Sequence, residues 1–517
     1  MRGMLSRMPL APTARDYLPL STMGSSAEYS DEKDVKRRDE IEIVAVSSKE
    51  VDTAAEFASG DLEALDPAEA LRIRLPYPPA DVQIQFMDKT TLGSSAILGI
   101  RINIFIWGVA LCSHAACKNF AGLFAVRLIL GMCEGSITAG FMIVTSMFYT
   151  RKEQTLRVGY WFLMNGTAQI ISGFISFGSL HIHTKTFEPW QWLMIITGFL
   201  TLLTATAFWL VHHLLSAHLY AVQPDNPALC PFRFLFPNSP TTAWFLTPAE
   251  KVIAVRRIKE NQTGVENKHF KKEQMIEALL DPKTWLFALF SALDNVPNSL
   301  TNQRQIIVSS FGFSPLQTTL LGCVDGFIEI VTIWTGVTLA AKIPNSRAYV
   351  GFIYFFPNIL GVFLINFLPW EHKVGLLFAQ WCTGVGTTGF VLSLSWLSSV
   401  TAGHTKRVTV NAIMLAAYCI GNSAGPFMWQ AKYAPRNHVP WIVIGICYIC
   451  CMALLLAIRY ILEAENKRRD NEDPMDDAHE DVYIEKFGKD GEMIKVKVDK
   501  EFLDLTDIQN RDFRYVL

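Results

Sequence analysis

Long apolar runs recur along the middle of the chain. Ten of them approach the ~20 residues that a helix needs to cross a hydrocarbon core, at 96 to 117, 120 to 149, 156 to 180, 191 to 215, 284 to 309, 316 to 341, 347 to 368, 374 to 400, 408 to 430 and 439 to 462. The polar stretch between the fourth and fifth runs separates a group of four from a group of six. The pattern predicts an all-α membrane protein built from two helical bundles.

The polar segments predict the domain boundaries. Residues 1 to 80 hold no sustained apolar face, so we expect a disordered cytosolic tail. An N-terminal bundle at 81 to 215 and a C-terminal six-helix bundle at 284 to 462 then flank a cytosolic linker at 216 to 283. A second cytosolic tail occupies 463 to 517.

Lysine and arginine collect in alternate loops, which sets the expected orientation. The rich loops hold Arg151 with Lys152, Lys342 with Arg347, and Lys406 with Arg407, and the stretch after the last run holds three more basic residues. Short cytosolic loops carry such an excess. We therefore expect an integral, multi-pass protein of the plasma membrane with both termini in the cytosol.

Composition narrows the function class. Half of the residues are hydrophobic and only 18% are charged, whereas soluble domains are nearer a quarter charged. The net charge of -2 offers no basic excess for binding nucleic acid. The ten cysteines fall mostly inside apolar runs, and no nucleotide-binding or catalytic motif stands in the right context. We expect no enzyme, no cofactor and no metal site.

Two charges inside one apolar run are the first candidate site. Arg127 and Glu134 are seven residues apart, which returns a helix to nearly the same face. An ionised side chain at bilayer depth is costly and tends to line a cavity. We expect the two to share one polar groove. The alternative is a buried ion pair that only pins neighbouring helices.

Amide side chains form further polar stripes at helical spacing. Asn165 and Gln169 begin one stripe, and Asn298 and Asn302 lie in a second, next to Pro297, which predicts a bend. A third stripe includes Tyr418 and Asn422. Together the stripes favour a hydrated central path. Each asparagine alone is equally consistent with hydrogen bonding between helices.

A carboxylate pair stands in the run at 316 to 341. Asp325 and Glu329 are one helical turn apart, so we expect one of them to hold a proton at neutral pH. This pair is a possible proton relay. The equally weighted alternative places Asp325 near the helix end, where water solvates it.

Several sequence blocks together resemble the allantoate permease branch of the major facilitator superfamily, in the anion:cation symporter group of fungi. They include FMDKTTLGSSAILGIR, AVRLILGMCEGSITAG, NVPNSLTN and ENKRRD. The resemblance implies twelve helices in two bundles and proton-coupled uptake of a small organic anion or carboxylate, such as allantoate or nicotinate. It further implies anion binding by Arg127 and Lys89 and proton coupling by Glu134 and Asp88. The partners would be the anion, protons and the lipid bilayer, and we expect a monomer.

The sequence departs from this family at two places. Arg101 runs directly into INIFIWGV, which resembles helix three, so most of helix one and all of helix two are lacking. Residues 212 to 233 resemble an insertion. Both departures could be real or errors of the gene model. The alternative function is therefore a membrane protein that does not transport, either a nutrient sensor or an inactive truncated relative.

Overall fold

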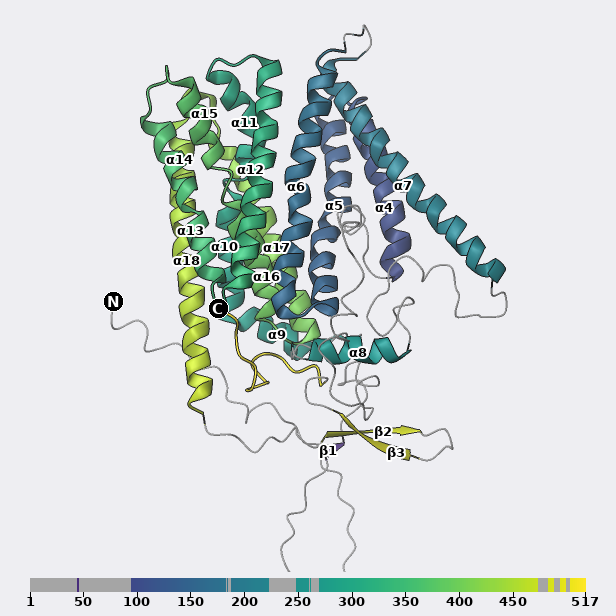
Figure 1. The fold of residues 1–517 in the computed structure, drawn as a ribbon. Coiled ribbons are helices and arrows are strands. Elements are labelled where there is room, and N and C mark those ends of the chain that lie inside the picture. The colour runs from purple at the N-terminus through teal and green to yellow at the C-terminus, as the bar shows by residue number, and fades with distance from the viewer. Residues whose placement is uncertain are drawn as a thin grey trace, which may run out of the picture.

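Helices make up nearly all of the architecture, and most of them stand side by side (Figure 1). The structure is a computed structural model that describes residues 44–45, 94–182, 184, 187–222, 248–259, 261, 269–472, 482–487, 493–498 and 503–517. The predicted disorder of residues 1 to 80 therefore lies outside the described residues, apart from Val44 and Ala45.

The first group holds four long helices in the described part of the chain. They are α4 (Ser94–His114), α5 (Phe120–Phe148), α6 (Arg151–Ser179) and α7 (Pro189–Val222). The side chain of Asn119 caps α5 by accepting from the Gly122 N–H at 2.8 Å. Thr150 and Glu153 form a capping box at the start of α6. The caps place the start of each helix at the start of an apolar run. The predicted group of four is confirmed.

Helix α4 joins two blocks that the family resemblance assigns to different helices. It runs without a break through Arg101 and Ile102, where the helix-one block meets the helix-three block. The junction is therefore a continuous helical turn rather than a loop.

The second group holds six spans, and three of them are broken. The unbroken spans are α12 (Pro315–Lys342), α17 (His404–Ala424) and α18 (His438–Asp470). The broken ones are α10 (Pro282–Asn295) with α11 (Ser299–Ser310), α13 (Arg347–Tyr354) with α14 (Phe356–Phe367), and α15 (Lys373–Cys382) with α16 (Thr387–Ser399). Two short 3-10 helices, Gly425–Met428 and Ala431–Tyr433, follow α17. The predicted group of six is confirmed.

Each break lies at a residue that disfavours continuous helix. Pro297 separates α10 from α11, as the sequence predicts. Pro357 occupies the first turn of α14, and Gly384 and Gly386 lie between α15 and α16.

The linker and the tail also contain regular structure. The described part of the linker forms α8 (Pro248–Lys259) and α9 (Lys272–Leu280). In the tail, β2 (Val482–Phe487) pairs antiparallel with β3 (Met493–Val498) and parallel with β1 (Val44–Ala45). The hydropathy pattern did not predict this small sheet. We call the end of the bundle that carries α8, α9 and residues 503–517 the tail-side end (Figure 1).

The two groups meet mainly where α6 packs on α12. Gly166 of α6 and Gly326 of α12 lie against each other there, and a Cβ on Gly166 would come within 2.5 Å of the Gly326 carbonyl oxygen. Small residues let helix backbones approach closely in membranes. This contact brings the polar stripe of α6 next to the carboxylates of α12.

Candidate functional site

The first polar contact between the two groups lies one turn from the glycine contact. The Gln169 amide of α6 donates a hydrogen bond to the Glu329 carboxylate of α12. Glu329 is only 6% exposed. A stripe residue and a relay residue therefore meet at the seam between the bundles, although the sequence pattern had placed them on separate helices without pairing them.

Asp325 lies one turn from Glu329 and pairs with an arginine of α11. The Arg304 guanidinium is 3.2 Å from the Asp325 carboxylate. Asp325 is buried in the middle of α12. The interpretation that water solvates Asp325 near a helix end is therefore wrong, because the helix begins ten residues earlier, at Pro315, and its neighbours cover this side chain.

The ion pair of Asp325 with Arg304 leaves part of the hydrogen-bonding capacity of both side chains unused. The Asp325 Oδ1 and the Arg304 Nε are both buried, and neither has a hydrogen-bond partner. A buried charged group normally satisfies its hydrogen-bonding capacity because losing water contacts is costly. The pair can therefore accept a further polar group, such as a proton donor on one side and an acceptor on the other.

The asparagine stripes meet at the break between α10 and α11, in the first span of the second group. The Asn298 amide donates to the Asn422 side-chain oxygen at 2.6 Å, and Asn422 in turn donates to Asn295 at 3.1 Å. Asn422 also donates to the Tyr418 carbonyl at 3.0 Å. These bonds link α17 to the α10 and α11 junction. These asparagines therefore form hydrogen bonds between helices, as the alternative interpretation of the stripes expects.

The other predicted stripe residues are spread over α6, α11 and α17. Asn165 is half-buried one turn before Gln169, and Asn302 is exposed on α11. The Tyr418 ring packs on Phe390, with ring centroids 5.6 Å apart. The structure brings Gln169 and Glu329 together, and Asn298 and Asn422 together, but not all of these residues at one point.

The sites suggested by family resemblance lie in the first group. Arg127 is exposed on α5. Glu134 is on the same helix, but its side chain lies outside the described residues, as do Asp88 and Lys89. The shared groove of Arg127 and Glu134 stays a prediction.

Two charged residues of the second group were missed. Arg304 stands within the stripe segment of α11, and Asp294 is half-buried near the end of α10. The criterion applied to Arg127, a charge inside a span, would have found both. The asparagine pattern drew attention to positions on either side of them.

The polar side chains in this part of the structure are mainly charged groups and amides. Within the described ranges, no group of three or more His, Cys, Asp or Glu residues could hold a metal ion. Two carboxylates, one guanidinium and several amides instead gather along α11, α12 and α6. Such residues inside a membrane bundle mark ion and substrate pathways.

The fold and these polar contacts define the chain as a multi-pass membrane transporter. It belongs to the Major Facilitator Superfamily, whose family model matches residues 95–426. The solved structure of the proton:xylose symporter XylE superposes with a TM-score of 0.52 at 12% identity, covering 78% of this chain and 90% of that one. That likeness supports the fold alone.

Named relatives come from yeast. The chain is 34% identical to the thiamine pathway transporter THI73 of Saccharomyces cerevisiae, covering 82% of this chain and 72% of the relative. It is 31% identical to the allantoate permease of the same yeast, covering 84% and 74%. The high affinity cysteine transporter of that organism is 28% identical, covering 80% and 75%. The family resemblance is confirmed, and the chain is a secondary transporter of small molecules rather than an enzyme.

Proposed function

We propose that this protein couples the inward movement of protons to uptake of a small organic anion or carboxylate, such as allantoate or nicotinate. The observation that carries the proposal is the ion pair of buried Asp325 with half-buried Arg304, next to Glu329, in which one polar atom of each partner is buried without a hydrogen bond. A guanidinium binds a carboxylate well because its donors match both oxygens. The relatives named for allantoate and cysteine transport fit the same substrate chemistry.

Protonation of Asp325 is the proposed coupling step. While Asp325 is ionised, its carboxylate occupies the Arg304 guanidinium. A proton on Asp325 removes the charge, weakens the 3.2 Å ion pair and leaves Arg304 able to hold an anionic substrate. Binding of the anion then favours the protonated form, so that proton and anion bind together.

Glu329 is proposed to pass this change to the bundle interface. When ionised it accepts a hydrogen bond from Gln169, which holds α12 to α6. When protonated it is neutral and accepts only through its carbonyl oxygen, so the charge-assisted hydrogen bond becomes a weaker neutral one. The state of one proton thereby alters a contact between the two bundles that must separate during alternating access.

The resemblance adds a second set of proposed residues in the first group. Arg127 and Lys89 would bind the anion, and Glu134 and Asp88 would assist proton transfer. Asn165, Gln169, Asn298, Asn302, Tyr418 and Asn422 would line the substrate path. We further propose a monomer in the plasma membrane whose tail-side end faces the cytosol, because that end carries Arg151, Arg347 and Lys406.

One observation favours the alternative, a sensor or inactive relative that does not transport. From Phe120 to Cys133, α5 buries only Cys133 against the described residues. Arg127 lies in this stretch. A site residue without an enclosing wall cannot hold a substrate away from water or lipid.

Growth on single nitrogen sources tests the proposal. The chain with its two lacking helices restored would be expressed in yeast that lacks its own organic-anion permeases, with allantoate or nicotinate supplied. We expect growth and uptake that stop when an uncoupler collapses the proton gradient. Uptake that persists with the uncoupler contradicts proton coupling. A chain that reaches the membrane but supports no uptake, even with the missing helices restored, favours the sensor.

A further inference from the structure

Residues 503–517, here called the strap, lie across the tail-side end of the bundle. The strap begins deep among α9, α10 and α17. Asp504 pairs with Lys271 at 3.1 Å and accepts from the His404 N–H at 2.7 Å, and Gln274 donates to the Asp504 carbonyl at 2.8 Å. These are contacts to the linker and to the second group.

Asp507 is the central anchor of the strap. It is fully buried between two lysines, with Lys406 Nζ at 3.0 Å and Lys283 closer still. Burial alone would raise the pKa of the Asp507 carboxyl, but the two ammonium groups outweigh this effect and hold its pKa well below the usual range. The Tyr515 hydroxyl donates a further hydrogen bond to Asp507 at 2.8 Å. The anchor is charged and satisfied at neutral pH.

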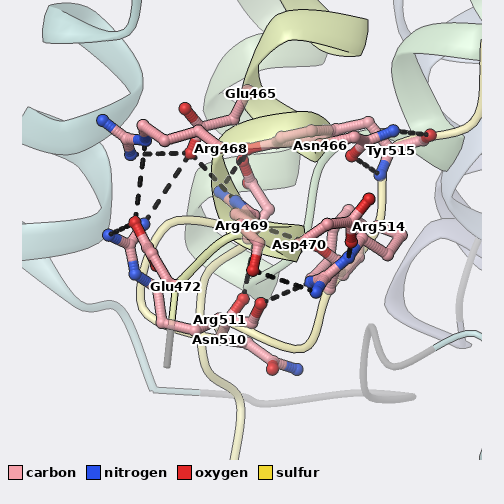
Figure 2. A network of polar contacts seen from close by, with 12 residues as sticks. Glu465, Asn466, Arg468, Arg469, Asp470, Glu472, Asn510, Arg511, Arg514 and Tyr515 are labelled. Atoms are coloured by element: carbon pink, nitrogen blue, oxygen red, sulfur yellow. Dashed lines mark hydrogen bonds and ion pairs between the residues drawn. The ribbon is translucent and has the colours of Figure 1, made fainter. Parts of the chain in front are cut away.

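The end of α18 holds the second half of the strap (Figure 2). The side chain of Asn466 donates to the Tyr515 carbonyl and accepts from the Tyr515 N–H, both at 2.8 Å, as a neighbouring strand would. Arg469 donates to the Phe513 carbonyl at 2.8 Å. The Trp396 indole donates to the Val516 carbonyl at 2.6 Å. The strap is therefore fixed to the second group along its length.

The strap contacts the first group at Arg151. The guanidinium of Arg151, at the start of α6, lies 4.0 Å from the ring centroid of Phe513 and donates to the Arg514 carbonyl at 3.3 Å. Phe513 itself is fully buried. A cation over an aromatic ring is attracted more strongly when both are desolvated.

Arg151 is also the point where the two groups close on each other. Its carbonyl accepts from Arg347 of α13 at 2.9 Å. Close by, Ser399 of α16 donates to Gln154 of α6 at 3.4 Å, and Arg407 of α17 donates to Ser146 of α5 at 3.1 Å. These polar contacts, like the strap contact, must break if the tail-side end opens.

We propose that the strap is an autoinhibitory clasp, anchored on the second group, that holds the tail-side end closed by gripping Arg151 through Phe513 and Arg514. This inference rests on the difference between the many contacts of the strap with the second group and its contact with Arg151 of the first group. Of the contacts described above, separation of the groups would leave the anchors at Asp507 and Tyr515 intact and would break the grip on Arg151. The clasp can therefore reset without refolding.

Distance measurements between spin labels test the clasp without substrate or proton gradient, so its failure is separate from failure of the proposed transport. Labels go on the exposed Lys152 of α6 and Lys342 of α12, replaced by cysteine in the full chain after its own cysteines are removed. Phe513→Ala is compared with Ile508→Ala, which changes an exposed residue, 42% accessible, of the same strap.

We expect Phe513→Ala to shift the labels to longer distances and to raise the ratio of open to closed molecules about tenfold, which corresponds to loss of one buried cation–π contact. Ile508→Ala should keep the parent distances. Phe513→Leu, which keeps bulk but not the ring, should give an intermediate shift and serves if the alanine variant fails to fold. Parent-like distances in the leucine variant and in a folded alanine variant overturn the proposal.

Discussion

The two groups of helices differ in how well they enclose their own polar residues. In the first group, the stretch of α5 from Phe120 to Cys133 buries only Cys133 within the described structure. In the second group, every residue of α16 from Thr388 to Ser399 is buried. Both helices are apolar spans of the same fold, so the difference comes from how many other helices pack around each of them.

The same contrast appears in the arginines. Arg127 of the first group is exposed, whereas Arg304 of the second is packed beside Asp325. A charge inside a span is a functional candidate only if other helices surround it. In the second group, neighbouring helices surround Arg304. In the first group, additional helices would be needed to surround Arg127.

Restoring the two helices that the first group lacks should have the largest effect on uptake. We expect an insertion of about 50 residues between positions 80 and 105, enough for two spans and a loop, to change uptake from undetectable to clearly measurable. The physical reason is that Arg127 then faces helices instead of the exterior. Growth on a candidate carboxylate as sole nitrogen source measures the effect, and equal growth of the two strains contradicts it.

Removing the cation of the second group should have the next largest effect. Arg304→Gln leaves Asp325 without its ion pair and removes the proposed anion receptor, so we expect KM for the carboxylate to rise roughly ten- to hundredfold in the restored chain. Lys432→Gln, which removes an exposed cation, is the control. Initial uptake rates over a range of substrate concentrations decide the question. An unchanged KM would place the anion elsewhere, with Arg127 the first alternative.

The seam between the groups can be tested by adding one methyl group. Gly166→Ala pushes a Cβ toward the Gly326 carbonyl, and overpacking of this kind costs about 1–3 kcal/mol. Gly178→Ala is the matched control on the same helix, because no atom lies within 4 Å of its Cβ position. We expect thermal unfolding in detergent at lower temperature for the first variant only. Equal melting temperatures would mean that α6 and α12 are not closely packed.

The smallest expected effect is the pH dependence of strap docking. Asp507 has its pKa lowered, so its contribution is complete above the ordinary value of 3.8 and falls only in acid. Docking should therefore not change from about pH 7 to about pH 9. A label at Ile508 whose mobility changes within that range would contradict this.

Much of the helix pattern could be predicted from the sequence, because apolar runs of spanning length and their caps are local signals. All ten predicted spans correspond to helices in the described structure. Pro297 gave the position of the first break. Pairing between distant helices was harder to predict. The contact of Gln169 with Glu329 depends on Gly166 meeting Gly326, and neither helix alone carries that information.

The structure of the C-terminal tail, in contrast to the helices, could not be predicted from local sequence patterns. Residues 503–517 are short and polar, which suggested a simple cytosolic extension. Asp507 is buried because Lys283 and Lys406 stand opposite it, more than a hundred residues away in the chain. Hydropathy along a sequence treats such a charge as solvated. Only the fold supplies the counter-charges that allow its burial.

Proton-driven accumulation in proteoliposomes tests the central claim most directly, that Asp325 and Glu329 of α12 act together to couple protons to anion uptake. The restored chain is compared with Glu329→Gln and with Glu463→Gln, which neutralises a more exposed carboxylate of α18. We predict that an inward proton gradient concentrates the labelled carboxylate in the restored chain and in the Glu463 variant, while the Glu329 variant exchanges it across the membrane without concentrating it. Full accumulation by the Glu329 variant would contradict the account.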